Sequence, residues 1–134
     1  MMREGVHMIK DHPWLGIGPN MVQRLYAQYR EPDAVNATNP HLHNVPMQIA
    51  AERGLPALAL WLWFLVSLVI ALARRIRGPD HRFLAASALA AVTAMLAAGM
   101  FEHNFGDSEF LMMLLLLITL PFAAARSPVV DLHA

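Results

Sequence analysis

Three long stretches without ionisable side chains constrain the fold of this chain more than any other feature. No Lys, Arg, Asp, Glu or His occurs in residues 55–73, 83–101 or 110–125. A helix over residues 55–73 would be about 28 Å long, close to the ~30 Å hydrocarbon core of a bilayer. A soluble core rarely needs three such stretches. The sequence therefore predicts an all-α integral membrane fold with three transmembrane helices.

The overall composition supports this class and excludes others. The 134 residues are 57% hydrophobic and 15% charged, against about 45–50% and about 25% in average soluble domains. Such a composition argues against disorder. The absence of cysteine excludes disulfides, thiolate metal sites and Cys nucleophiles. Ten basic residues balance ten acidic ones, so there is no excess positive field to attract nucleic acid.

The charges between the three stretches predict an orientation. The loop 102–109 contains three acidic residues and no Lys or Arg. The loop between the first two stretches has one acid, Asp80, and four arginines, namely Arg74, Arg75, Arg77 and Arg82. The positive-inside rule places an arginine-rich loop in the cytoplasm. We therefore expect residues 1–54 and the loop 102–109 on the opposite face, and residues 127–134 as a cytoplasmic tail.

Residues 1–54 are polar and rich in proline and histidine, which predicts a segment of short interfacial helices. We expect helices over 1–10, 20–30 and 45–53, the last separated from the first transmembrane helix by Gly54. Asn44 is suited to cap the third helix, with a proline in its first turn. The start of the chain lacks the continuous apolar region of a signal peptide.

The glycines of residues 12–19, HPWLGIGP, do not indicate a nucleotide site. A nucleotide-binding fingerprint has a third glycine and a preceding strand, and both are missing. We interpret this segment as a tight turn between two surface helices.

The group best suited to chemistry is Asn39-Pro40-His41-Leu42-His43-Asn44, followed by Glu52. Histidine is the usual general base near neutral pH, which makes His43 a candidate base before a helix. Alternatively, these His and Asn side chains merely cap the helix. His41 and His43 would point the same way in an extended loop and could serve a metal. No third ligand follows at a useful spacing, so we expect no metal.

The short loop Glu102-His103-Asn104, with Asp107 and Glu109, lies on the predicted face of His43. Its titratable groups could line a polar cavity there. The alternative is a solvated turn between two membrane helices.

Three motifs together resemble a known family. They are PxxGxG at Pro13–Gly18, HxHN at His41–Asn44 and ExG at Glu52–Gly54, which leads into a hydrophobic stretch. In order and spacing they resemble the C-terminal part of the O-antigen ligase and O-antigen polymerase superfamily. Its members are multi-pass proteins of the bacterial inner membrane that build polysaccharides such as lipopolysaccharide. The resemblance implies a glycosyltransferase without metal or other cofactor, which moves a glycan from undecaprenyl diphosphate to an acceptor hydroxyl at the periplasmic face.

The resemblance also implies roles for individual residues. His43 would be the catalytic base for the acceptor, with His41, Asn44 and Glu52 in support. In the family, arginines of earlier periplasmic loops stabilise the diphosphate, and those loops are absent here. The local candidates for binding phosphate are Arg24, Arg30 and Arg53. The N-terminus of the helix 45–53 is a further candidate, because helix N-termini favour anions.

Because family members have many more spans, we expect this chain to be a C-terminal fragment of such an enzyme. Its partners would be the lipid-linked donor, the bilayer and the missing N-terminal membrane spans. The alternative is a non-catalytic membrane remnant or subunit that stabilises a partner protein. A transporter-like bundle is disfavoured, because the spans lack the ionisable residues that transport pathways use.

Overall fold

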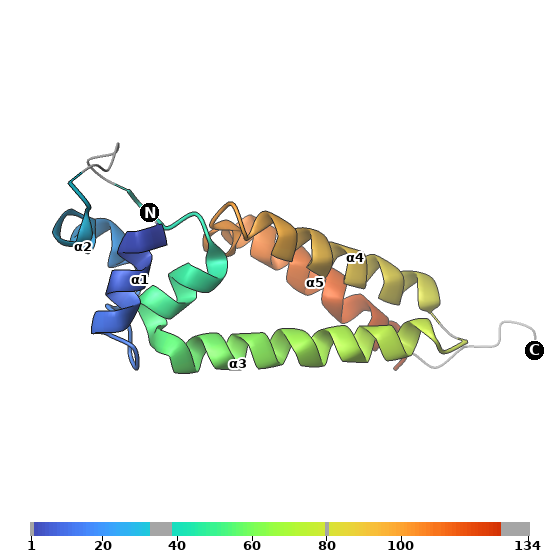
Figure 1. The fold of residues 1–134 in the computed structure, drawn as a ribbon. Helices are drawn as coiled ribbons and strands as arrows, with labels where there is room; N and C mark the ends of the chain where they lie inside the picture. The colour runs from blue at the N-terminus through green and yellow to red at the C-terminus, as the bar shows by residue number, and fades with distance from the viewer. Residues whose placement is uncertain (1, 33–38, 80, 127–134) are drawn as a thin grey trace, which may run out of the picture.

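The protein is all-helical. The computed structural model describes residues 2–32, 39–79 and 81–126, and this part contains no strand. The predicted cytoplasmic tail, 127–134, and Asp80 lie outside the described residues. Figure 1 shows the arrangement of the elements. In chain order they are α1 (Met2–Asp11), α2 (Val22–Tyr29), α3 (Val45–Ile76), α4 (Arg82–Ala98), the short 3-10 helix η1 (Asn104–Gly106) and α5 (Ser108–Ala124).

Helix α3 consists of two helical segments that meet at an angle (Figure 1). The break is at Gly54, whose φ of 83° and ψ of 170° are not helical. Pro56 stands in the first turn of the second segment, where a missing N–H costs little. The predicted separation of residues 45–53 from the following apolar helix is therefore confirmed. The second segment, 55–76, is about 33 Å long at 1.5 Å per residue.

The loop before α2 satisfies the backbone groups that this break exposes. A helix that ends leaves carbonyl groups without partners. Here the Ala51 carbonyl accepts a hydrogen bond from the N–H of Ile17 (2.8 Å), and the Glu52 carbonyl accepts one from Gly18 (3.0 Å). On the other side of the break, the N–H of Leu55 donates to the Pro13 carbonyl (2.8 Å). The glycine-containing loop is thus more than a turn, because it joins the two segments of α3.

Two glycines make this close approach possible. Gly16 and Gly54 both have positive φ, at 66° and 83°, a region that residues with a Cβ rarely adopt. A Cβ at Gly16 would overlap the backbone of Glu52, and one at Gly54 would overlap the carbonyl of Trp14. Any other residue at either position would push the loop away from α3.

The buried residues form two apolar clusters. The first joins α1, α2 and the first segment of α3 through Met8, Val22, Leu42 and Ala51. The second joins the long segment of α3 to α4 and α5 through Leu72, Ala88, Val92 and Ile118. We call the first assembly the N-terminal unit and the second the helical bundle.

The outer surface of the helical bundle is apolar. Trp63 is 70% exposed, Phe83 81% and Leu116 60%. Helix α3 is long and apolar enough to cross a membrane, and only 11% of its most apolar window is buried. Helices α4 and α5 are apolar but shorter. These exposed apolar faces and the length of α3 indicate a membrane-associated protein.

We expect Gly54→Ala to destabilise the chain by at least about 1–3 kcal/mol, the usual cost for a residue with a Cβ in this sparsely populated, glycine-only φ/ψ region. The overlap with Trp14 adds to this cost. Thermal unfolding in detergent, followed by circular dichroism, measures the effect. Gly78→Ala is the matched control, because a Cβ there meets only the Arg75 carbonyl at an ordinary 3.4 Å. Equal unfolding temperatures for the two variants would contradict the role of the break.

Candidate active site

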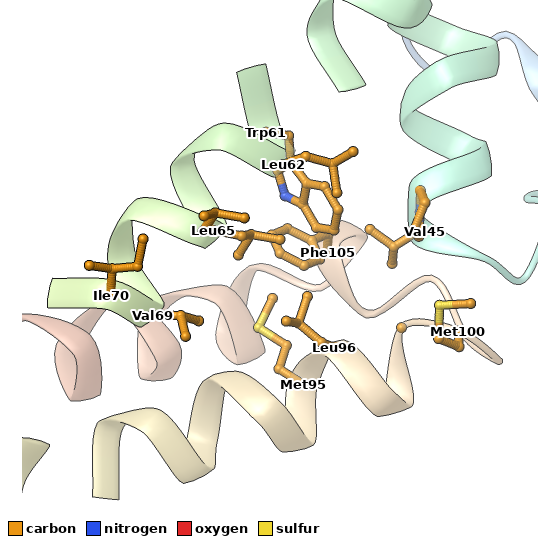
Figure 2. Close-up of a pocket in the computed structure, with 13 residues that line it drawn as sticks. Val45, Trp61, Leu62, Leu65, Val69, Ile70, Met95, Leu96, Met100 and Phe105 are labelled. Atoms are coloured by element: carbon orange, nitrogen blue, oxygen red, sulfur yellow. The ribbon is translucent and has the colours of Figure 1, made fainter. Parts of the chain in front are cut away.

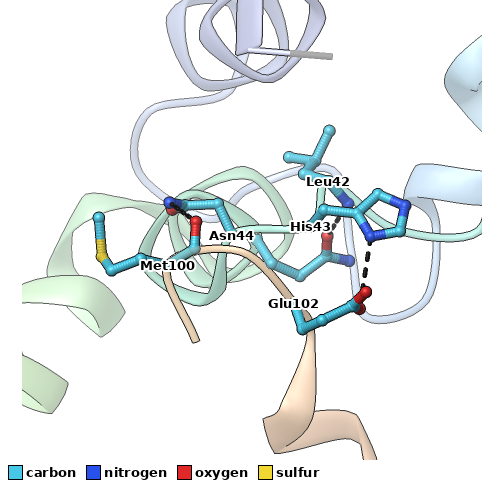
Figure 3. A network of polar contacts seen from close by, with 6 residues as sticks. Leu42, His43, Asn44, Met100 and Glu102 are labelled. Atoms are coloured by element: carbon cyan, nitrogen blue, oxygen red, sulfur yellow. Dashed lines mark hydrogen bonds and ion pairs between the residues drawn. The ribbon is translucent and has the colours of Figure 1, made fainter. Parts of the chain in front are cut away.

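The HxHN loop is attached to the start of α3 and to the end of α4. The Asn44 side chain accepts a hydrogen bond from the N–H of Met47 (3.0 Å), which confirms it as the N-cap of α3. The same side chain donates to the Met100 carbonyl (3.2 Å; Figure 3). The N–H of Val45 donates to the Gly99 carbonyl (2.7 Å). The bonds to Met100 and Gly99 fix the loop against the segment that leads into residues 102–104.

Two consecutive buried hydrogen bonds also attach the HxHN loop to the first segment of α3. The N–H of Leu42 donates to Oε1 of Gln48 (2.8 Å), and Nε2 of Gln48 donates to Oε1 of Glu52 (2.8 Å). Glu52 is only 3% exposed. Its carboxylate therefore orients Gln48 and, through it, the backbone between the two histidines. We interpret Glu52 as a residue that positions the loop.

His43 pairs with a carboxylate that is distant in the sequence. Its Nδ1 lies 3.4 Å from Oε2 of Glu102, and the two side chains are 41% and 66% exposed (Figure 3). The backbone of His43 is left-handed, with a φ of 52°. Such a conformation costs on the order of 1–3 kcal/mol and persists where surrounding bonds enforce it. The neighbouring bonds of Leu42 and Asn44 supply that enforcement here.

The loop after α4 also brings His103 to the site. The ring of His41 contacts that of His43 edge-on, with centroids 4.2 Å apart, and lies 5.6 Å from that of His103. The sequence left a polar cavity and a solvated turn as alternatives for this loop. Glu102 and His103 lie against the histidines of the HxHN loop, with the Glu102 side chain 66% exposed. The solvated turn describes Asp107 and Glu109, which are exposed. Asp107 also caps α5 by accepting a hydrogen bond from the N–H of Glu109 (3.0 Å).

No sequence pattern identifies Glu102 as a partner of His43. The only available signal was that both lie on the predicted non-cytoplasmic face. Their pairing depends on the end of α4 meeting the start of α3.

Burial lowers the pKa of His41 and of His103. Desolvation is the main cause for both, followed by the neighbouring imidazole: His43 for His41, and His41 for His103. Both rings are therefore neutral at pH 7. The Nδ1 atom of each is buried and lacks a hydrogen-bond partner among the described residues.

The three arginines proposed for phosphate lie in different surroundings. Arg24, Arg30 and Arg53 are all exposed. Arg53 is close enough to lower the pKa of His103 by its charge, although desolvation is the larger cause. No hydrogen bond or ion pair links Arg24 or Arg30 to the HxHN loop in the described part of the chain. Of the three, only Arg53 influences the pKa of a histidine of the site among the described residues, and that influence is smaller than desolvation.

The N-terminus of α3 has no free donor for a phosphate, contrary to the expectation from sequence. The N–H of Val45 binds Gly99, that of Met47 binds the Asn44 side chain, and that of Gln48 binds the Asn44 carbonyl. Pro46 has no N–H. Every donor of the first turn is thus satisfied within the protein.

An apolar cavity of about 390 Å³ lies beside the site, between α3 and α4 (Figure 2). Its wall includes Val45, the residue directly after the HxHN motif. The rings of Trp61 and Phe105 meet there edge-on, with centroids 5.5 Å apart. The remaining lining residues include Leu65, Val69, Met95 and Leu96. This volume is within the usual range of small-molecule pockets, about 300–1,000 Å³.

These features define a helical, membrane-associated protein with a histidine- and carboxylate-containing site beside an apolar cavity. More particularly, residues 1–62 match the family model described as O-antigen ligase. No curated protein and no solved structure matches the chain. The matched residues include the PxxGxG, HxHN and ExG motifs, so the resemblance inferred from them is confirmed over this part of the chain. The match and the apolar α3 support a membrane protein of polysaccharide biosynthesis.

The lowered pKa values predict that stability falls on acidification. The folded protein holds His41 and His103 neutral, whereas the unfolded chain binds protons at both near pH 6.5. Because the unfolded state then carries more protons, the free energy of unfolding decreases as the pH falls through about 6.5. We expect a lower unfolding temperature at pH 5.5 than at pH 7.5, and a smaller difference in His103→Gln. The exposed His12→Gln is the control. An unchanged pH dependence in His103→Gln would refute this account.

Proposed function

We propose that this chain carries the acceptor-activating site of an O-antigen ligase-like glycosyltransferase. The enzyme would transfer a glycan from undecaprenyl diphosphate to an acceptor hydroxyl at the periplasmic face of the bacterial inner membrane. The observation that carries the proposal is the His43–Glu102 pair, placed on a loop of the matched family region. The pair lies beside the apolar helices, where a lipid-linked substrate is to be found.

The pair has the arrangement of a general base and its orienting carboxylate. With Glu102 accepting from Nδ1–H of His43, the lone pair of Nε2 is available for a proton. His43 then takes the proton of the acceptor hydroxyl as its oxygen attacks the anomeric carbon of the glycan. The bond from that carbon to the diphosphate breaks, and the lipid diphosphate leaves with the bonding electrons.

The leaving diphosphate needs cationic partners, since its developing charge must be stabilised. The start of α3 offers no free N–H, and among the described residues Arg53 is the one candidate arginine that influences the pKa of a histidine of the site. We therefore propose that further membrane segments of the enzyme supply the remaining cations. On this view the chain does not transfer glycan alone.

The apolar cavity supports a lipid-linked donor. Its lining begins at Val45, continues along α3 to Val69 and Ile70, and includes Met95 and Leu96 of α4. A hydrocarbon chain whose head group lies near His43 would have an apolar surface to follow. Part of the isoprenoid tail would suffice to fill about 390 Å³.

We propose three membrane spans, formed by residues 55–76, α4 and α5. The last two are each about 26 Å long at 1.5 Å per residue. Their shortness relative to a bilayer of about 30 Å is accommodated by local thinning at modest cost. The arginine loop would lie in the cytoplasm and the N-terminal unit in the periplasm. A non-catalytic subunit is the competing proposal, because the exposed apolar faces of the bundle would equally suit binding to a partner protein.

We expect His43→Asn to reduce glycan transfer by about 10²–10⁴, the usual contribution of a general base. Asparagine tolerates positive φ better than alanine does, so this variant keeps the loop conformation. Glu102→Gln should reduce the rate at least about tenfold, because the carboxylate that selects the tautomer is lost. The assay measures glycan transfer in membranes that also contain the N-terminal spans of a related ligase. His12→Asn should leave the rate unchanged. Full activity of His43→Asn would exclude the catalytic role.

We expect a cysteine at Gln28 to react with a membrane-impermeant thiol reagent in cells whose outer membrane has been permeabilised. A cysteine at Gly78 should react only after the inner membrane is also disrupted. The asymmetry of arginines between the loops is the reason. The native chain contains no cysteine, so the background is low. Labelling at position 78 but not at position 28 in intact inner membranes would reverse the proposed orientation.

A further inference from the structure

Three side chains of the site lie close enough together to bind one metal ion. His41, His43 and Glu102 each offer one ligand atom, and the three atoms all lie within 4.8 Å of one another. Two of the groups are already in contact, with Nδ1 of His43 and Oε2 of Glu102 3.4 Å apart. The rings of His41 and His43 have centroids 4.2 Å apart. The sequence offers no third ligand at a useful spacing from His41 and His43, whereas the structure brings Glu102 to them as a candidate.

The donor set indicates which ion would fit. Two imidazole nitrogens and one carboxylate oxygen are the protein ligands of an open zinc site, with water in the fourth position. Magnesium and calcium prefer sites made of oxygen ligands. Zinc–ligand distances are about 2.0–2.2 Å. Tetrahedral ligand atoms are therefore about 3.3–3.6 Å apart, which the cluster reaches by closing by little more than about 1 Å.

The backbone around these groups holds them in place, while the side chains retain some freedom. Asn44 and Val45 tie the loop of both histidines to Met100 and Gly99, two residues before Glu102 and three before it respectively. The Glu102 side chain is 66% exposed. It can turn toward an ion without breaking a buried contact. The two loops therefore need not move for a metal to bind.

We propose that His41, His43 and Glu102 bind one zinc-class divalent ion, and that the bound ion inhibits glycan transfer. Binding the ion would occupy His43 and Glu102, the two groups that the proposed function uses as base and orienting carboxylate. The transfer itself needs no metal on this view, so the ion is an inhibitor and not a cofactor. The metal site stands independently of the transfer reaction, whereas its inhibitory effect rests on the proposed function.

Calorimetric titration of the full chain tests the site. The protein is purified in detergent, stripped with a chelator and titrated with zinc chloride. We expect one equivalent to bind, and at least tenfold weaker binding in His41→Asn, in His43→Asn and in Glu102→Gln. His12→Asn and His81→Asn should bind as the native chain does, and magnesium chloride should give no binding. Circular dichroism establishes that each variant is folded.

Cobalt provides a structural readout. Co²⁺ in place of zinc should give the visible absorption of a tetrahedral site, which Glu102→Gln should lose. Failure of the native chain to bind zinc, or equal binding by His43→Asn or Glu102→Gln, would overturn the proposal.

The transfer assay separates this inference from the proposed function. Zinc at saturation should suppress native transfer by at least tenfold, and a chelator should restore it. Specific zinc binding together with full transfer by His43→Asn would refute the role of His43 as base and support the metal site. Loss of transfer in His43→Asn, with no zinc binding by the native chain, would support the base and refute the metal site.

Discussion

The hydrogen bonds between the loop 13–18 and the broken helix α3 are the constraint on which the rest of the structure depends. A break at Gly54 exposes backbone carbonyl and N–H groups of the helix, and it is stable only if those groups find other hydrogen-bond partners. Ile17, Gly18 and Pro13 provide those partners. The break allows residues 45–53 to pack against α1 and α2 while residues 55–76 join the bundle. The PxxGxG and ExG motifs are therefore two halves of one backbone interaction.

The HxHN motif is the third part of the same assembly. It precedes residues 45–53, the helical segment that the break at Gly54 separates from the rest of α3. That segment carries Gln48 and Glu52, whose side chains fix the HxHN loop by hydrogen bonds. Asn44 connects the loop to the end of α4 as well as capping α3. One asparagine thus orients the histidines relative to both the N-terminal unit and the helical bundle. The same bonds satisfy the first turn of α3, which is why that helix N-terminus does not provide an anion site.

Local features of the fold were predictable from the sequence, and contacts between distant segments were not. The cap at Asn44, the break at Gly54 and the helices over residues 2–11 and 22–29 follow from spacing, proline and glycine within a few residues. The pairing of His43 with Glu102 joins residues 59 positions apart (102 minus 43). It depends on the length of α4 and on the direction in which α4 leaves the bundle, which no short pattern encodes. For the same reason, Gly16 and Gly18 suggested a turn, while their partners in α3 could not be inferred.

The two halves of the candidate site come from different parts of the chain. His43 lies within residues 1–62, the part that matches the O-antigen ligase family model, whereas Glu102 lies beyond it. Residues 1–62 thus supply the imidazole of His43 on a strained backbone, and the α4–α5 connection supplies the carboxylate. The carboxylate reaches His43 only because Gly99 and Met100 are bonded to the start of α3. The geometry of the His43–Glu102 pair therefore depends on the contacts between the N-terminal unit and the helical bundle, so substitutions at that junction should alter the pair without changing either side chain.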